Sequence, residues 1–577
     1  MRSSAPTRRC DWVAPIAVAV LAAAAAFVAL DRNSKTAPSR VLFSNCTVNT
    51  GERVYQNGAL VVENGVILDV GDAEAVRSRW SGGPDSVEER SLEGNFVLPG
   101  LIDAHAHVIM GGSFLKMLDL SGATTREEFV GMVASAGASK QPGEWIVGYG
   151  FDERKLAGGA MPGRDWIDGV TAQNPVLISR ADGHTALANS LALSLAGIGA
   201  GTPDTPGGEI ARGPGNEPTG ILKDAAITLA RRAMPPQTMR QKEEAVMAAA
   251  SFALSNGVTT VGDMGTPIFS LPKEECWSEF EDVLLRMADS GALGVRVKTC
   301  VPLDLWAELA DFVARRPETH HPGLRLFWGT VKEFYDGSLG SETALMTDPY
   351  LGSEGNVGLR IHEDREALAS RIGAAKRAGL QVAMHAIGDL AVDETISLLS
   401  GLESGGGGGG GGGDRIEHAQ HTSGLQALDR MASLGAHAVV NPLHIADDVG
   451  AMLEKLGEER AGVGRSYAFR SMVEAGVAVS FGSDWPLVAP LDPLASVVAA
   501  TSGRKHVPPE RLTRQEAIAA VTWRAAEALN VSDFVGRLDR GMRADFVVVD
   551  ADLLDPGAEK PVVLKTFLDG ECVYVQE

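Results

Sequence analysis

The stretch VLPGLIDAHAH, residues 97–107, is an apolar, strand-like run that ends in two histidines one residue apart. Side chains at positions i and i+2 of a strand point to the same face. His105 and His107 are therefore expected to converge at the carboxyl end of that strand. Two neutral imidazoles arranged in this way form half of a site for a borderline metal such as zinc. Histidine pairs are also common as ordinary surface or core residues, so the rest of the chain decides what this pair means.

Seven further strand-like segments follow, and helical stretches separate them. We expect strands at residues 258–264, 294–301, 327–337, 380–389, 415–420, 436–442 and 477–486, and helices at 242–256, 304–316, 363–378 and 514–529. Near-continuous apolar strands that alternate with helices are typical of a parallel sheet covered by helices. Together with the strand that ends in His105 and His107 they make eight strands, the number that closes a (β/α)8 barrel of the TIM type. The sequence thus predicts an α/β barrel protein whose functional residues lie at the carboxyl ends of the barrel strands.

We expect the barrel to span residues 98–534. Three regions do not fit its strand–helix pattern: the two chain ends, a long insertion and a glycine run. Short strands and turns in residues 40–97 and 535–577 are expected to pair into a small β-sandwich built from both chain ends. Residues 108–257 are too long for an ordinary connection, so we interpret them as an inserted lid subdomain over the barrel mouth. We interpret the glycine run at 405–413 as a flexible, inert loop.

The composition limits the partners of the chain. Its 577 residues allow a large catalytic domain and a smaller one, and its formal net charge is -22. That balance argues against nucleic acid as a partner, because a phosphate backbone requires a basic surface. Five scattered cysteines without a C-x-x-C pair favour free thiols over a disulfide framework. We expect a small-molecule substrate, and a homodimer stays open.

Residues 1–39 combine a basic flank with an apolar segment. Arginines precede an uncharged run, residues 12–30, that is nearly long enough to cross a membrane. We interpret the run as a signal anchor, a hydrophobic transmembrane helix. It would hold a single-pass membrane protein in the endomembrane or secretory pathway, or on the extracytoplasmic side. A cleaved signal peptide, which would release a secreted protein, is the alternative, because small residues in the run supply cleavage sites.

Ligand-type side chains recur at the carboxyl ends of the predicted strands. After the first histidine pair they are Lys332, His385, His418 and Asp484, in the fourth, fifth, sixth and eighth strands. Each is flanked by apolar residues and would be buried, so each needs a partner. A core histidine that bonds to backbone is the usual alternative for any single one. That alternative is hard to sustain for four histidines and an aspartate at one barrel end.

Several motifs resemble those of the metal-dependent amidohydrolase superfamily. They are VLPGLIDAHAH, TVKEFYDGSLG, AMHAIGD, RIEHAQ, SFGSDWP and RLDRGMRADFVVVD. Together with GYGFDERKL (148–156) and GHTALANS (183–190), they resemble the subgroup called amidohydrolase family 3, which includes N-substituted formamide deformylase. The resemblance covers residues 40–577. It implies a metal-dependent hydrolase that cleaves a carbon–nitrogen bond, other than a peptide bond, in a small molecule.

The resemblance also implies a set of metal ligands. His105 and His107 correspond to ligands of a first divalent ion, expected to be zinc, and His385 and His418 to the ligands of the fifth and sixth strands. Lys332 lies where many members carry a carboxylated lysine that bridges two ions. Carboxylation is needed because a free ammonium has no lone pair for a metal. The site is then binuclear, or mononuclear if Lys332 is only an ion-pair partner.

Asp484 is expected to act both as a ligand and as the catalytic residue. The metal would lower the pKa of a bound water and form hydroxide, and Asp484 would take its proton and pass it to the leaving nitrogen. A turn-forming aspartate is the alternative. His184, Asp336 and Trp485 are candidate substrate-binding residues, with loop, turn and core-packing roles as alternatives. We interpret His444 as a surface or loop residue.

Two other functions remain open from the sequence. The same metal centre could act on an ester, a lactone or a cyclic imide, because hydroxide attacks each of these carbonyl groups. A catalytically silent, membrane-anchored scaffold is the second alternative.

Overall fold

The structure is a computed structural model, which describes residues 40–80, 87–181, 184–266, 271–316, 318–401, 413–502, 510–555 and 557–577. The chain divides into two compact units. Of the described residues, those in 113–241 form the inserted unit, and those in 40–112 and 242–577 form the main unit. The glycine run at 405–413 lies outside the described residues except for Gly413.

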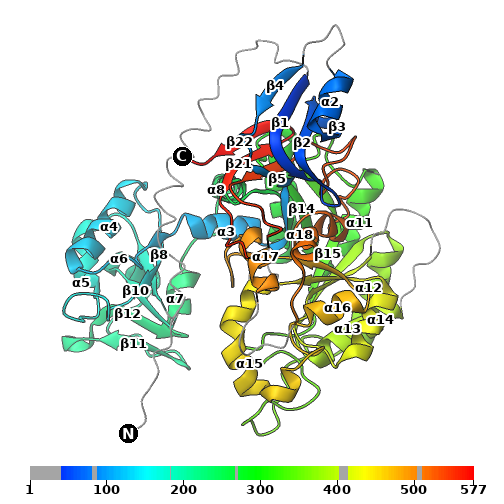
Figure 1. The fold of residues 1–577 in the computed structure, drawn as a ribbon. Helices are drawn as coiled ribbons and strands as arrows, with labels where there is room; N and C mark the ends of the chain where they lie inside the picture. Colours follow the sequence, from blue (N-terminus) through cyan, green and yellow to red (C-terminus); the bar gives the residue numbers. More distant parts are fainter. Residues whose placement is uncertain are drawn as a thin grey trace, which may run out of the picture. The chain divides into compact units, whose positions relative to one another are not determined.

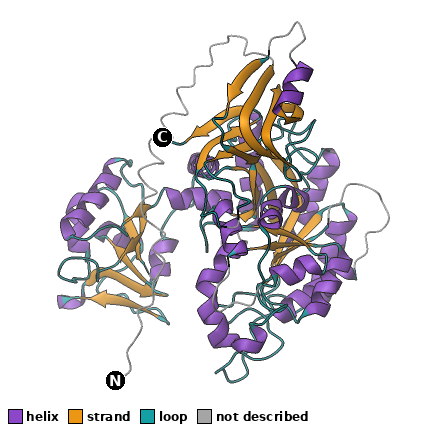
Figure 2. Ribbon diagram, in the orientation of Figure 1, coloured by secondary structure: helices purple, strands orange, loops and turns teal. Residues whose placement is uncertain are grey.

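Eight parallel strands form a nearly closed barrel in the main unit, which confirms the predicted α/β barrel of the TIM type. Their order is β6 (Leu101–Ala106), β13 (Val258–Asp263), β14 (Arg296–Pro302), β15 (Leu326–Phe334), β16 (Gln381–Ala386), β17 (Arg415–His418), β18 (His437–Val440) and β19 (Ala478–Phe481). Nearly every residue in these strands is buried. Figure 2 shows helices around the strands, and a strand covered on both sides must be apolar along most of its length.

The barrel closes between β6 and the loop after β19, beside the histidine pair. The amide of Asp484 donates to the carbonyl of His105 at 2.7 Å, and the amide of His107 donates to the carbonyl of Trp485 at 2.8 Å. Gly482 lies where the two segments approach most closely, because a Cβ there would lie 2.4 Å from Cβ of His105. Only glycine leaves room for this approach.

Most helices of the main unit alternate with the barrel strands along the chain, whereas α2 precedes the first barrel strand. They are α2 (Ala73–Trp80), α3 (Val108–Leu115), α8 (Met239–Ser255), α9 (Lys273–Ser278), α10 (Arg286–Asp289), α11 (Trp306–Arg315), α12 (Arg365–Arg377), α13 (Asp389–Ser400), α14 (Leu425–Leu434), α15 (Ile445–Arg460), α16 (Phe469–Glu474), α17 (Pro493–Thr501), α18 (Arg514–Ala520) and α19 (Trp523–Ala528). The helix predicted at 514–529 is therefore two helices. Thr522, with φ -131° and ψ -106°, interrupts the helical backbone between them.

Strands from both chain ends form a second sheet of eight strands. These are β1 (Arg40–Asn49), β2 (Val54–Glu63), β3 (Val66–Asp72), β4 (Glu88–Ser91), β5 (Phe96–Pro99), β20 (Phe546–Val549), β21 (Val563–Leu568) and β22 (Glu571–Val575). The two ends meet where β5 pairs antiparallel with β20, and Figure 1 shows blue and red strands in one sheet. Hydrogen bonds join all these strands into one sheet, which packs on itself, because the ring of Phe43 in β1 lies 5.1 Å from that of Phe546 in β20 and 5.3 Å from that of Phe567 in β21. The predicted pairing of the two chain ends is thus seen, with the sheet folded over a shared core.

A buried ion pair joins this sheet to the barrel. Nε and Nη2 of Arg296, in β14, lie 2.7 and 2.8 Å from the two carboxylate oxygens of Asp545, which precedes β20. The side chain of Arg296 is fully buried. Arg296 also pairs with Asp569, which follows β21, so two carboxylates near the ends of this sheet neutralise one buried guanidinium of the barrel.

The inserted unit has a sheet and a core of its own. Its strands are β7 (Leu118–Asp119), β8 (Ile146–Phe151), β9 (Val176–Arg180), β10 (Thr185–Ala188), β11 (Gly208–Arg212) and β12 (Pro218–Asp224), in the order β11-β12-β10-β9-β8-β7. Its helices are α4 (Arg126–Ala138), α5 (Arg164–Ile167), α6 (Ser190–Leu195) and α7 (Ile227–Arg232). Its core includes Phe129, Phe151 and Ile178. The proposed lid position of this unit stays a prediction.

The predicted membrane anchor has to be corrected. Among the residues that the structure describes, no helix combines the length and the apolar character needed to cross a bilayer. Residues 12–30, on which the prediction rested, lie outside the described part of the chain. The N-terminal transmembrane helix, the single-pass membrane location and the membrane as a partner are therefore not carried further.

Candidate metal centre

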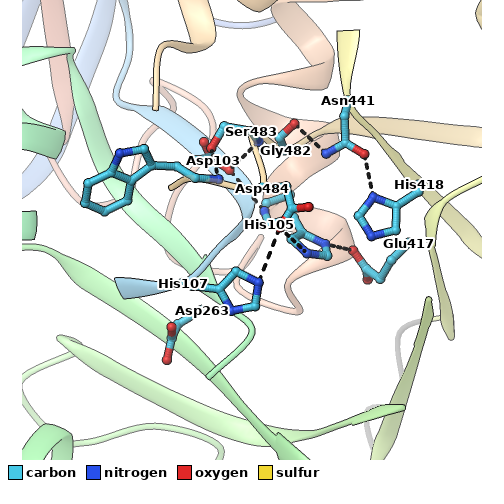
Figure 3. Close-up of polar contacts among 12 residues, drawn as sticks. Asp103, His105, His107, Asp263, Glu417, His418, Asn441, Gly482, Ser483 and Asp484 are labelled. Carbon is cyan, nitrogen blue, oxygen red and sulfur yellow. Dashed lines mark hydrogen bonds and ion pairs between the residues drawn. The ribbon is translucent and has the colours of Figure 1, made fainter. Parts of the chain in front are cut away.

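The carboxylate of Asp484 faces both histidines that end β6. Its Oδ1 lies 3.4 Å from Nε2 of His105 and 3.3 Å from Nε2 of His107. Figure 3 shows the three side chains turned toward one another. Asp484 follows β19 with a φ of 57°, a left-handed conformation that is uncommon outside glycine. The closure of the barrel thus brings the first and the last predicted ligands together.

Two further histidines lie beside this group. The ring centroid of His418 lies 4.8 Å from that of His105 and 4.5 Å from that of His385. One ligand atom from each of His105, His418 and Asp484 can be chosen so that all three lie within 4.8 Å of one another. All of these side chains are buried. Four predicted histidine positions and Asp484 therefore occupy one end of the barrel.

Hydrogen bonds decide which nitrogen of the histidines in the H-x-H pair is available. Nδ1 of His105 lies 2.6 Å from a carboxylate oxygen of Glu417, and Nδ1 of His107 lies 2.5 Å from the carbonyl oxygen of Gly265. A carboxylate and a carbonyl can only accept, so Nδ1 donates in both rings. In the neutral rings Nε2 then carries the lone pair. These Nε2 atoms are the ones that face Asp484.

The other two rings are fixed in opposite ways. Nδ1 of His418 lies 2.8 Å from Oδ1 of Asn441, so this ring also presents Nε2 when neutral. Nε2 of His385 lies 3.0 Å from the carbonyl oxygen of Gly337. Nε2 of His385 must donate there, and its free lone pair is on Nδ1. Burial lowers the pKa of His385 to about 3, which favours the neutral ring that can bind a metal.

The donor set fits a divalent cation. Two Nε2 lone pairs converge on Oδ1 of Asp484, a buried atom without a hydrogen-bond donor among the described residues. Buried acceptors that converge in this way are stabilised by a positive charge between them, either a proton on an imidazole or a metal ion. Imidazole nitrogens with a carboxylate oxygen are ligands that zinc and similar ions prefer.

Lys332 enters the barrel from β15. Its Nζ is buried and has no hydrogen-bond acceptor in the described part of the chain. Burial lowers the pKa of this amine, while Glu417 and Asp484 oppose that effect. An unpaired ammonium in such a position is costly, so burial shifts this group toward its neutral form.

The weaker predicted residues have other contacts. The carboxylate of Asp336 accepts main-chain N–H groups of Leu345, Ile387 and Gly388 at 2.8–3.0 Å, so it holds two loops together. Trp485 is buried, and its ring stacks on Phe252 with centroids 5.4 Å apart. These contacts match the turn-forming and packing alternatives.

His184 lies in the inserted unit. Its Nδ1 is 2.7 Å from Oδ1 of Asp224, and its side chain is exposed. A contact between His184 and substrate stays a prediction.

Sequence reasoning missed several residues around the centre. Glu417 holds His105, Asn441 holds His418, and Asp103 accepts the main-chain N–H groups of His105 and Ser483 at 3.1 and 3.0 Å. Asp103 is two residues before His105, so strand alternation could have placed it on the same face. Asn441 is a polar residue directly after an apolar strand, and this is the pattern by which the other site residues were identified.

His444, for which the sequence predicts a surface or loop position, is buried beside the centre, in the short helical turn after β18. Its Nε2 lies 3.2 Å from the carbonyl oxygen of Ser483, and its ring centroid lies 6.4 Å from that of His418.

Comparisons with known proteins agree with this geometry. Residues 88–574 match the amidohydrolase family. The protein LONG AFTER FAR-RED 3 of Arabidopsis thaliana is 37% identical over 546 residues, which cover 92% of this chain and 91% of that protein. N-substituted formamide deformylase of Arthrobacter pascens is 28% identical and covers 89% of this chain and 94% of that protein. The crystal structure of an uncharacterized metal-dependent hydrolase from Pyrococcus furiosus superposes with a TM-score of 0.72 at 29% identity, covering 89% of this chain and 100% of that one.

The chain therefore belongs to the amidohydrolase family. It is an enzyme of the class that hydrolyses carbon–nitrogen bonds other than peptide bonds. The family implies a divalent metal site, and the cluster of His105, His418 and Asp484 is suited to one.

Proposed function

We propose that the barrel end holds one or two divalent ions, with zinc expected, and that the protein hydrolyses an amide-type bond of a small molecule. The observation that carries the proposal is the convergence of Nε2 of His105, Nε2 of His107 and Oδ1 of Asp484, all buried. A divalent ion bound there supplies Lewis acidity and lowers the pKa of a water molecule toward neutrality.

The side chains of the protein would position and move the proton. As a carboxylate beside the Nε2 atoms of His105 and His107, Asp484 can accept a proton from the attacking water. The same carboxyl group can then deliver that proton to the departing nitrogen. Glu417 and the carbonyl of Gly265 hold His105 and His107 so that their Nε2 atoms stay directed at the reacting region.

Lys332 decides whether one or two ions are expected. Its buried, unpaired amine has a lowered pKa, and a neutral amine is the form that combines with carbon dioxide to give a carbamate. A carbamate would offer two anionic oxygens beside His385 and His418. We propose a binuclear centre with carboxylated Lys332, and a mononuclear centre if this lysine is unmodified.

A substrate screen with metal-replete protein tests the function. We expect hydrolysis of N-formyl compounds or other small amides, loss of that activity on chelation, and its return when zinc is added. Esters, lactones and cyclic imides form a second panel. Activity on that panel alone would mean that the enzyme cleaves a bond other than an amide. If protein with bound metal hydrolysed no compound of either panel, the catalytically silent scaffold would be favoured and the proposal contradicted.

A further inference from the structure

The seventh strand, β18, supplies no predicted ligand, but the residue after it joins two strands that do. Oδ1 of Asn441 lies 2.8 Å from Nδ1 of His418, at the end of β17. Its Nδ2 donates to the carbonyl oxygen of Gly482, after β19, at 2.9 Å. Figure 3 shows both contacts from one side chain. The amide therefore bridges the segments that carry His418 and Asp484.

The orientation of this amide follows from its partners. The carbonyl oxygen of Gly482 can only accept a hydrogen bond, so the NH2 group of Asn441 must face it. The amide oxygen must then face Nδ1 of His418, which must donate. The asparagine thus fixes the proton of His418 on Nδ1 and leaves Nε2 free for a cation.

The place of Gly482 extends the effect of the bridge to His105. Gly482 lies against His105 so closely that a Cβ would be 2.4 Å away, and its own amide donates to the carbonyl of Val440 at 3.0 Å. Asn441 is 1% exposed, so water cannot readily replace its hydrogen bonds. Without the side-chain amide of Asn441, both the ring of His418 and the Gly482 segment that leads to Asp484 would lose a hydrogen bond that holds them in place.

We propose that Asn441 is a positioning residue that sets the affinity of the centre for its divalent ion, by fixing the tautomer of His418 and the approach of the Asp484 segment at once. The inference rests on the proposed function. It concerns the residues that hold the metal ligands in place. The residues of β18, His437–Val440, include no carboxylate that could replace Asn441 as the hydrogen-bond acceptor for His418.

The test uses Zn²⁺ alone as the probe, with the full-length protein, and measures its dissociation constant by competition with a chelator. We expect Asn441→Ala to weaken Zn²⁺ binding by about 10- to 100-fold. Asn441→Asp keeps an oxygen against Nδ1 of His418, so it should recover most of the affinity. Its other oxygen would face the carbonyl of Gly482, so a lower unfolding temperature of the metal-free protein is expected.

Asn189→Ala is the matched control. Asn189 is also 1% exposed, and its side-chain amide likewise bridges backbone groups, accepting from Val176 and donating to the carbonyl of Asn174 within the inserted unit. This variant should lower the unfolding temperature and leave Zn²⁺ affinity unchanged.

Three results would contradict parts of the account separately. Wild-type protein that binds no Zn²⁺ would contradict the proposed function. Wild-type protein that binds Zn²⁺, with Asn441→Ala binding it equally well, would overturn only the role of Asn441. If Asn441→Asp were as weak as Asn441→Ala, the acceptor role toward His418 would be wrong.

Discussion

Glu417 and His418 are consecutive residues of β17, yet both reach His105. Oε2 of Glu417 lies 2.6 Å from Nδ1 of His105, and the ring centroid of His418 lies 4.8 Å from that of His105. Alternation along a strand would send the two side chains to opposite faces. The φ of 71° at His418 departs from the extended conformation, so the side chain of His418 lies on the same side as that of Glu417. Such a backbone persists only where the surrounding structure holds it.

Glu417 is expected to be essential to the stability of this end of the barrel. Burial raises its pKa, but Arg415 and His105 lower it to about 2, so it is a buried carboxylate. Nε of Arg415 lies 2.8 Å from Oε1 of Glu417. Glu417→Gln leaves Arg415 uncompensated, and we expect the free energy of unfolding to fall by about 3–5 kcal/mol, measured by urea denaturation.

A surface pair provides the comparison for Glu417. Glu63 lies 2.9 Å from Nε of Arg40, and both side chains are partly exposed. Glu63→Gln should cost no more than about 1 kcal/mol. Equal losses in the two variants would show that Glu417 is not a compensating buried charge.

Asp484 carries the proposed proton transfer. Asp484→Asn keeps the size of the side chain and removes its ability to accept a proton, so hydrolysis should fall by about 10²-fold or more while the fold is retained. Turnover of the best compound from the substrate screen is the measurement, with circular dichroism as the check on folding.

Asp492→Asn is the control for Asp484. Asp492 caps α17 by accepting from the amide of Ala495 at 2.9 Å, and asparagine caps a helix equally well. This variant should hydrolyse substrate at the wild-type rate. Normal turnover by Asp484→Asn would remove Asp484 from the chemistry.

Gly482 tests the link between barrel closure and the site. A methyl group there would meet Cβ of His105 at 2.4 Å and its backbone at 2.8 Å, so the two segments must separate. We expect Gly482→Ala to lower the free energy of unfolding by about 1–3 kcal/mol, and to weaken Zn²⁺ binding because His105 and Asp484 are moved apart.

Gly450, inside α15, gives the opposite expectation. Nothing lies within 4 Å of a Cβ built on Gly450. Gly450→Ala should therefore stabilise the protein by about 0.5–1 kcal/mol through helix propensity, with Zn²⁺ binding unchanged. Gly482→Ala with wild-type stability and Zn²⁺ affinity would contradict the closeness of the two segments.

The start of α18 predicts a pH dependence of stability. Glu516 accepts hydrogen bonds from Arg470 and from the backbone and hydroxyl of Thr513, and these contacts lower its pKa from 4.5 to about 2. Because the folded pKa is depressed, the stabilisation is present above pH 4.5 and is lost as the pH falls from there toward 2.

Glu516→Gln isolates this contribution, because glutamine keeps the capping geometry and loses the charge. At pH 7 the variant should be less stable than wild type by about 0.5–1 kcal/mol. The difference should shrink below pH 4.5 in urea titrations at a series of pH values. A difference that stays constant down to pH 3 would show that the ion pair does not cause it.

The sequence predicted the barrel strands well because each is a short apolar run ending in a polar residue. Ligand-type residues were recognisable for the same reason. Glu417 could not be recognised, because strand alternation directs it away from His418 and only the left-handed backbone reverses this. The break at Thr522 and the continuous hydrogen bonding through the end sheet depend on tertiary contacts that local patterns do not contain.

The metal content of the purified protein tests the central claim most directly. Wild-type protein should retain at least one tightly bound divalent ion per chain by elemental analysis, and His105→Ala and His418→Ala should each lose it while remaining folded. A wild-type protein that stays free of metal after incubation with zinc, or variants that bind as much zinc as wild type, would contradict the assignment of these side chains to one centre.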